Sequence, residues 1–115
     1  MKNIYTKVYS LKEADDLGHF IMSMGYEGVQ NDSYRYCRET MKRAFKENNR
    51  HHRDYIYVGV NTYSLVVGRS ERWMRKQNCI KCMKDVNTFK KSLTNEYQDF
   101  MKRLEKIHKA NGWQA

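Results

Sequence analysis

A strand that leads directly into a capped helix is encoded in the first 25 residues of the chain. Residues 3–9 are rich in β-branched and aromatic side chains and have the alternation of a strand. Ser10 follows, and Glu13 stands three residues later, which is the spacing of a capping box at the start of a helix. Apolar residues then recur at helical spacing as far as Gly25, a residue type that commonly ends helices. These signals predict a strand followed at once by an amphipathic helix.

The rest of the chain adds further helices and strands. The residue patterns predict these elements at 33–50 (helix), 55–60 and 63–67 (strands joined at Asn61-Thr62), 79–84 (short strand) and 88–110 (helix). The resulting order β-α-α-β-β-β-α is typical of an α+β fold, and we expect a small, mainly antiparallel sheet with helices packed on one face. The 115 residues include no proline and no linker-like tract, so we predict a single domain over residues 1–115.

The last predicted helix is long for a chain of this size. Residues 88–110 would extend over about 30–35 Å, whereas a domain of this length has a radius of gyration of about 13–14 Å. The apolar stripe of the helix could therefore be covered in two ways. Either it lies across the sheet of its own chain, or part of it packs against a second copy, in a homodimer, or against another protein.

The positive charge is concentrated in the middle of the chain. The formal net charge is +9, from 22 Lys and Arg against 13 Asp and Glu. Residues 35–53 and 69–84 each carry a net charge of +5, whereas residues 1–34 sum to −2. This distribution favours a cationic patch for an anionic partner, and the alternative is a solvated surface with no specific partner.

Aromatic residues stand next to cations in and between these basic segments. They do so at residues 34–36, 53–57 and 72–76. Single-stranded nucleic acid is held in this way, because its bases stack on rings while its phosphates meet Arg and Lys. The same residue types also dominate protein–protein interfaces.

The predicted site for nucleic acid or another anion extends over both basic segments. It consists of Arg35, Arg38, Lys42, Arg43, Lys46, Arg50, His51, His52, Arg53, Arg69, Arg72, Trp73, Arg75 and Lys76. On the strand at 55–60 we expect Ile56 and Val58 to face the core, which leaves Tyr55 and Tyr57 partly exposed. No base-reading motif accompanies these residues, so we predict little sequence specificity.

Two further motifs could carry chemistry. Cys79 and Cys82 have the C-x-x-C spacing of zinc sites and redox dithiols, but on a strand their side chains would point to opposite faces. We therefore predict no metal and no cofactor, with plain buried or half-buried cysteines favoured over the alternatives of zinc at Cys79 and Cys82 and of redox activity. The pair His51-His52 lies between two arginines, which favours neutral imidazoles. No Ser, Cys or carboxylate is placed by the sequence to form a nucleophile–base pair with them, so we expect no enzyme. A small nuclease-like activity of His51 and His52 is the alternative.

The opening IYTKVYSLKEADDLGHFIMSMGY and the later DVNTFKKSL resemble many small, mostly uncharacterised bacteriophage and prophage proteins. In that group a short strand leads to a capped helix that ends in Gly-Tyr, and β-rich segments precede a final Asp- or Asn-capped helix. The resemblance covers residues 3–26 and 79–93, and the basic helix at 33–50 departs from the pattern. It implies a phage-type protein in a bacterial cytoplasm, where such proteins often bind and disable or redirect a host component.

Composition bears on location and on the class of function. No apolar run approaches the roughly 20 residues of a membrane span, and the N-terminus lacks the apolar region of a signal peptide. Three cysteines fit a reducing compartment, so we predict a cytoplasmic protein with no membrane partner. The leading hypothesis is a regulatory or anti-defence protein whose basic surface engages RNA, DNA or a host nucleoprotein. The alternative is an inhibitor or adaptor that binds an acidic, nucleic-acid-competing surface of a host enzyme.

Overall fold

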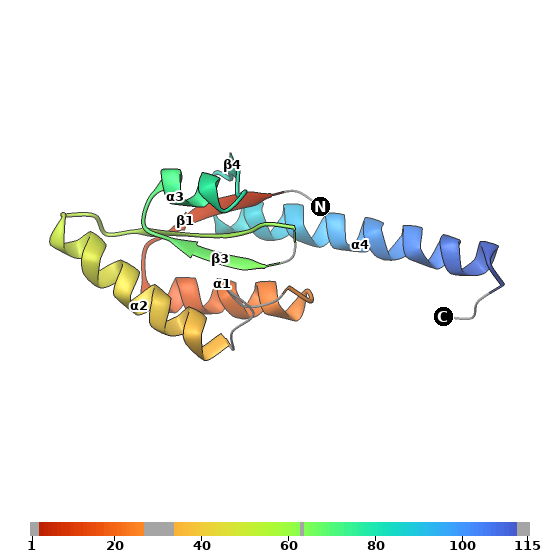
Figure 1. Ribbon diagram of the computed structural model, residues 1–115, viewed down its shortest axis with the longest axis horizontal. Coiled ribbons are helices and arrows are strands. Elements are labelled where there is room, and N and C mark those ends of the chain that lie inside the picture. Colours follow the sequence, from red (N-terminus) through yellow and green to blue (C-terminus); the bar gives the residue numbers. More distant parts are fainter. Residues whose placement is uncertain (1–2, 27–33, 63, 113–115) are drawn as a thin grey trace.

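The computed structural model describes residues 3–26, 34–62 and 64–112, which form a four-stranded sheet with helices on both faces (Figure 1). The strands are β1 (Ile4–Val8), β2 (Ile56–Val60), β3 (Leu65–Gly68) and β4 (Lys81–Cys82), in the spatial order β3-β2-β1-β4. β2 pairs antiparallel with β1 and β3, whereas β4 runs parallel to β1. Ile4 lies opposite Val60 and Val8 opposite Ile56, so these apolar side chains of the two central strands share one face.

Side-chain caps mark where several helices begin. The helices are α1 (Leu11–Ser23), α2 (Tyr34–Arg50), α3 (Glu71–Lys76) and α4 (Val86–Ala110). The Ser10 hydroxyl accepts a hydrogen bond from the Glu13 N–H at 3.0 Å, and the Asp85 carboxylate accepts one from the Thr88 N–H at 2.7 Å. The α+β class and the order of elements are as predicted, and α3 is an additional short helix.

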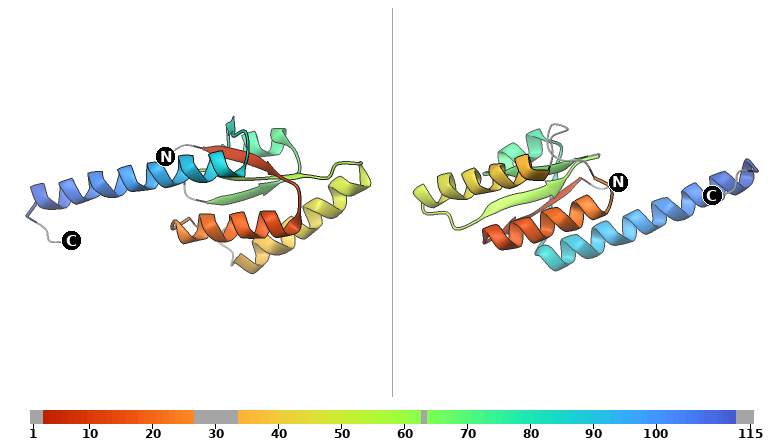
Figure 2. Two further views of the ribbon diagram at one scale, coloured as in Figure 1. Left: turned by 180° about the vertical axis from the view of Figure 1, so that it is seen from behind. Right: turned by 90° about the horizontal axis from the view of Figure 1, so that it is seen from below.

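The larger core lies between the sheet and the helices α1, α2 and α4 (Figures 1 and 2). Its buried side chains come from both central strands, from β3 and from all three helices; they include Val8, Leu17, Ile21, Met41, Val58, Leu65, Phe89 and Leu93. Full burial of each large side chain stabilises the fold by about 1.5–3 kcal/mol. This core holds α2 over β2 and β3, so the side of α2 that faces away from the sheet lies in solvent.

The second face of the sheet is covered by α3. Tyr5 and Tyr57 lie there with their ring centroids 5.6 Å apart, and Met74 of α3 and Cys79 are buried with them. The prediction that Tyr57 is partly exposed is therefore wrong, because the helix that covers it was not foreseen. Tyr55, next to it on the same face, is half-buried and its ring meets that of Tyr57 edge-on.

The first turns of α4 pack on the rest of the protein. Phe89 and Leu93 are buried, and the helix then projects away from the sheet (Figures 1 and 2). The molecule is consequently 57 Å long but only 27 and 24 Å across. On the projecting part Met101 is 44% and Ile107 53% exposed, so the outer apolar stripe is not covered by the chain's own sheet. In the part of the chain that the structure describes, no helix combines the length and the hydropathy that crossing a bilayer needs.

Candidate nucleic-acid interface

The basic residues of α2 lie on its solvent side, as their spacing predicts. The exposed ones are Arg35, Arg38, Lys42, Arg43, Lys46 and Arg50. Carboxylates pair with Arg38 (Asp15, 3.8 Å), Lys42 (Glu39, 3.3 Å) and Arg50 (Glu47, 3.1 Å). Such exposed ion pairs contribute only about 0–1 kcal/mol, so they leave these cations available to a ligand. The other three form no ion pair with any described residue.

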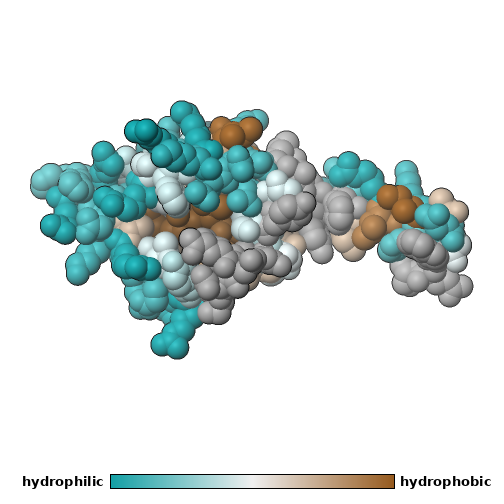
Figure 3. Space-filling view, viewed as in Figure 1, coloured by the Kyte–Doolittle hydropathy of each residue, from teal (hydrophilic) through white to brown (hydrophobic). Residues whose placement is uncertain are grey.

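A hollow of about 560 Å³ opens between α2, the end of β3 and α3. Three arginines from separate segments line it: Arg43 of α2, Arg53 after α2 and Arg69 after β3. Glu47 is the only carboxylate among the described residues that line the hollow, so its lining carries a net charge of +2. In Figure 3 hydrophobic residues show at the bottom of a recess between the hydrophilic surfaces of α3 and α2. The hollow therefore combines a cationic rim with an apolar floor.

Trp73 of α3 forms part of the hollow and is held there by β3. Its indole Nε1–H donates a hydrogen bond to the Val67 carbonyl at 3.2 Å, yet the residue remains 45% exposed. A Cβ atom at Gly68 would collide with the Trp73 ring and would lie 2.7 Å from Sδ of Met74. A glycine at this position is therefore needed for α3 to bring its indole onto the end of the strand.

Asn48 connects the segments that carry the arginines, although it was not among the predicted site residues. It is fully buried, and its amide Nδ2 donates hydrogen bonds to the carbonyls of Tyr55 (2.8 Å) and Arg69 (3.1 Å). Its Oδ1 accepts one from Nε of Arg69 at 3.3 Å. The sequence does carry a signal for the burial of Asn48. This amide lies at helical spacing from Cys37 and Met41, whose side chains face the core.

The turn after α2 brings Arg53 back to the hollow. The Asn48 carbonyl accepts hydrogen bonds from the backbone N–H groups of His51 (3.0 Å) and Arg53 (2.8 Å). His52 has φ of 60°, a left-handed conformation that allows this tight reversal. Both histidines are exposed, and neither lines the hollow. Within the described residues, no hydrogen bond joins either imidazole to another side chain.

The remaining predicted cations do not line the hollow. Arg72, Arg75 and Lys76 are exposed on α3, where Arg75 pairs with Glu71 at 3.7 Å. From the predicted site the structure therefore gathers Arg43, Arg53, Arg69 and Trp73 at this hollow, and the other predicted residues do not line it. Tyr36 of α2, which lies in one of the aromatic–basic groups, also lines the hollow and is 38% exposed.

The cysteine pair does not form a joint site. Cys79 is buried under α3, and burial raises the pKa of its thiol to about 12. Cys82 is exposed on β4. The described part of the chain contains no group of three or more His, Cys, Asp or Glu side chains that could hold a metal ion.

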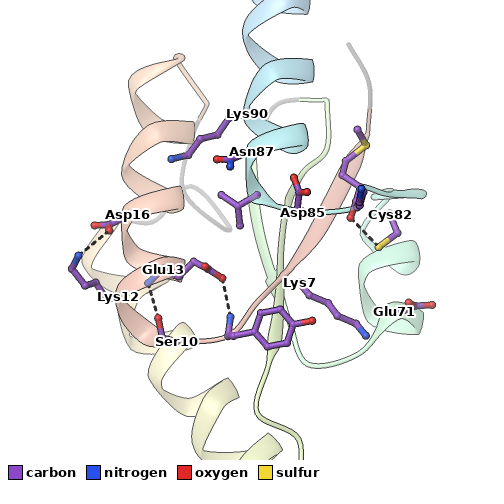
Figure 4. A pocket seen from close by; sticks show the side chains of 14 residues that line it. Lys7, Ser10, Lys12, Glu13, Asp16, Glu71, Cys82, Asp85, Asn87 and Lys90 are labelled. Atoms are coloured by element: carbon purple, nitrogen blue, oxygen red, sulfur yellow. Dashed lines mark hydrogen bonds and ion pairs between the residues drawn. The ribbon is translucent and has the colours of Figure 1, made fainter.

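A second hollow, of about 840 Å³, lies where β1, the start of α1 and the start of α4 meet (Figure 4). Its lining includes four lysines and four carboxylates: Lys7, Lys12, Lys84, Lys90, Glu13, Asp16, Glu71 and Asp85. Glu13 and Asp85 already accept backbone N–H groups at the helix starts, and Lys12 pairs with Asp16 at 3.7 Å. The charges of this hollow are balanced internally, so the hollow beside α2 is the better candidate for an anionic ligand.

Comparisons with protein-family models, with curated proteins and with solved structures found no match to this chain.

Proposed function

We propose that the protein is a non-enzymatic binding protein whose basic surface, centred on the hollow between α2, β3 and α3, binds nucleic acid. The observation that carries this proposal is the meeting of Arg43, Arg53 and Arg69 with the exposed Trp73 around one hollow. Guanidinium groups bind phosphates through two parallel hydrogen bonds, and indole rings stack on bases. A surface that serves solubility alone gives no reason for these groups to gather at one place.

Other exposed cations on the two helices that border the hollow support a larger footprint on the nucleic-acid backbone. Arg35 and Lys46 on α2 and Arg72 and Lys76 on α3 are exposed and form no ion pair with any residue in the described ranges. Each would contact phosphate without reading a base, which fits binding with little sequence preference.

We place this activity in the cytoplasm of a bacterial host, in line with the resemblance to phage proteins. Binding to a host nucleic acid or nucleoprotein would there serve regulation or anti-defence. The three cysteines of the chain, an odd number, do not make a disulfide framework, which supports a reducing compartment.

The projecting half of α4 supports a second proposal, a homodimer. Leu104 and Ile107 lie on one side of this helix by their spacing, while Lys102, Lys106 and Lys109 lie on the other. Two such stripes can pack together while the lysines remain in water. An acidic host protein is the alternative occupant of the stripe, and with it the protein would act as an inhibitor or adaptor.

The nucleic-acid proposal is tested by fluorescence anisotropy with a labelled oligonucleotide of about 12 nucleotides, a length within the range of single-strand binding sites. We expect the double variant Arg43→Glu/Arg53→Glu to bind roughly tenfold or more weakly, because phosphate contacts dominate affinity. The logarithm of the wild-type affinity should also fall linearly with the logarithm of salt concentration, with a slope of about −0.7 for each phosphate contact on a single strand.

The matched control is Lys102→Glu/Lys106→Glu, which makes the same change in charge on α4, away from the hollow. We expect this variant to retain most of the affinity. Equal losses in both double variants would show that net charge alone attracts the oligonucleotide, and the hollow would then not be the binding site. A complex whose affinity is insensitive to salt would also contradict the proposal.

A further inference from the structure

The hollow beside α2 has a feature that binding to phosphate alone does not require, namely two exposed aromatic side chains. Trp73 comes from α3 and Tyr36 from α2, and these helices lie on opposite sides of β3 (Figure 1). Phosphate contacts need only cations, whereas aromatic rings add the ability to stack on a flat apolar ligand.

The indole of Trp73 is positioned before any ligand binds. Its Nε1–H is engaged by the Val67 carbonyl, and its ring rests on the backbone of Gly68. Few rotamers are therefore lost when a ligand stacks on it, which favours affinity. The apolar floor and the exposed ring together suit a planar, uncharged group.

The guanidinium groups at the rim suit the phosphates next to such a group. Among the residues that the structure describes, no carboxylate pairs with Arg43 or Arg53. A phosphate could therefore bind these arginines without displacing a carboxylate. Arg69 is held by Asn48 and lies 4.0 Å from Glu47. A nucleotide of a polymer combines the two chemistries, a flat base and flanking anionic phosphates.

We propose that this hollow binds an unpaired base of single-stranded RNA or DNA, which stacks on Trp73 while the adjacent phosphates pair with Arg43 and Arg53. The inference rests on the proposed nucleic-acid binding and specifies its substrate class. A duplex keeps its bases stacked in its interior, so it can offer the hollow only backbone. The protein should therefore prefer single strands to duplexes of the same length.

The decisive comparison uses oligonucleotides that keep the phosphates and lose the bases. Labelled oligothymidylate and oligouridylate of about 12 nucleotides are compared with an abasic strand of the same length and with a duplex. We expect Trp73→Ala to weaken binding to both base-containing strands roughly 5- to 150-fold, the range of one stacked base. Its binding to the abasic strand and to the duplex should be unchanged.

Two further variants separate stacking from damage to the fold. Tyr36→Ala removes an exposed ring from the α2 wall and should weaken single-strand binding selectively, in the same direction as Trp73→Ala. Tyr9→Ala is the matched control, because Tyr9 is exposed and lies outside this hollow. In a Trp113→Phe background Trp73 is the only tryptophan, and its fluorescence should be quenched by oligothymidylate and not by the abasic strand.

The results separate this inference from the proposal on which it rests. If wild type binds abasic and base-containing strands equally well, or Trp73→Ala weakens both alike, the base-binding role is wrong while nucleic-acid binding stands. If wild type binds none of the four probes, nucleic-acid binding itself is wrong. Selective loss on the base-containing strands, whether RNA or DNA, with quenching of Trp73, supports the inference.

Discussion

Asn48 is a polar residue in an apolar position, and its contacts explain why it is there. Its buried side chain satisfies the carbonyls of Tyr55 and Arg69 through hydrogen bonds that are partly shielded from water. Asn48→Ala would leave both carbonyls without this donor, and a buried unsatisfied group costs about 1–3 kcal/mol. We expect the free energy of unfolding, measured with urea, to fall by roughly 2–4 kcal/mol.

The neighbouring Asn49 provides the control for this prediction. It is exposed on α2, so Asn49→Ala should leave stability unchanged or raise it slightly through better helix propensity. Similar losses of stability in the two variants would show that the amide network of Asn48 is not what holds the segments together.

Cys79 leads to a second prediction at the scale of one residue, which concerns how the stability of the protein depends on pH. Burial raises the pKa of its thiol to about 12, whereas in the unfolded chain a thiol titrates near 8.5. Above about pH 8.5 the unfolded state loses this proton and the native state keeps it, so stability falls as pH rises. Relative to Cys79→Ala, wild type should lose about 1 kcal/mol between about pH 8 and 9.5.

Urea unfolding of both proteins across this range, under reducing conditions, measures the difference. If the stability difference between wild type and Cys79→Ala does not change with pH, the thiol ionises as readily in the native protein as in the unfolded chain. That result would contradict the burial of Cys79 beneath α3.

Among the elements, those with local signals were predicted and those that depend on distant contacts were not. The start of α1 follows from Ser10 and Glu13, and the last helix from an apolar stripe capped by Asp85. α3 was missed because a helix of six residues is too short to show a period, and four of its residues are charged. Without α3, the burial of Tyr57 could not be foreseen.

The candidate site shows the same division between local and distant information. Charge along the chain identified the basic segments. The helical period of α2 separately predicted which of its side chains face solvent. The meeting of Arg53 and Arg69 at one hollow could not be predicted, because it depends on bonds from Asn48 to both neighbouring segments.

At the scale of the whole molecule, α4 determines the shape and would determine assembly. Its outer turns extend a body 24–27 Å across to a length of 57 Å, with Ile107 exposed along the way. In the proposed homodimer this stripe is covered by a second copy, and two nucleic-acid sites are joined in one particle. Joined sites raise apparent affinity for a long strand well above that of one site.

Analytical ultracentrifugation over a wide range of concentration tests the assembly. We expect wild type to sediment with twice the mass of one chain and Ile107→Lys as a monomer, because the variant places a charge in the apolar stripe. Gln98→Lys adds the same charge on the side of α4 opposite Ile107 and should leave the dimer intact.

Since each copy carries a net charge of +9, added salt should strengthen the dimer by screening repulsion. The same salt should weaken nucleic-acid binding, because counterions released by phosphate contacts gain less entropy in a more concentrated solution. A wild type that is monomeric at every concentration would contradict the homodimer and would leave the stripe of α4 to a different protein.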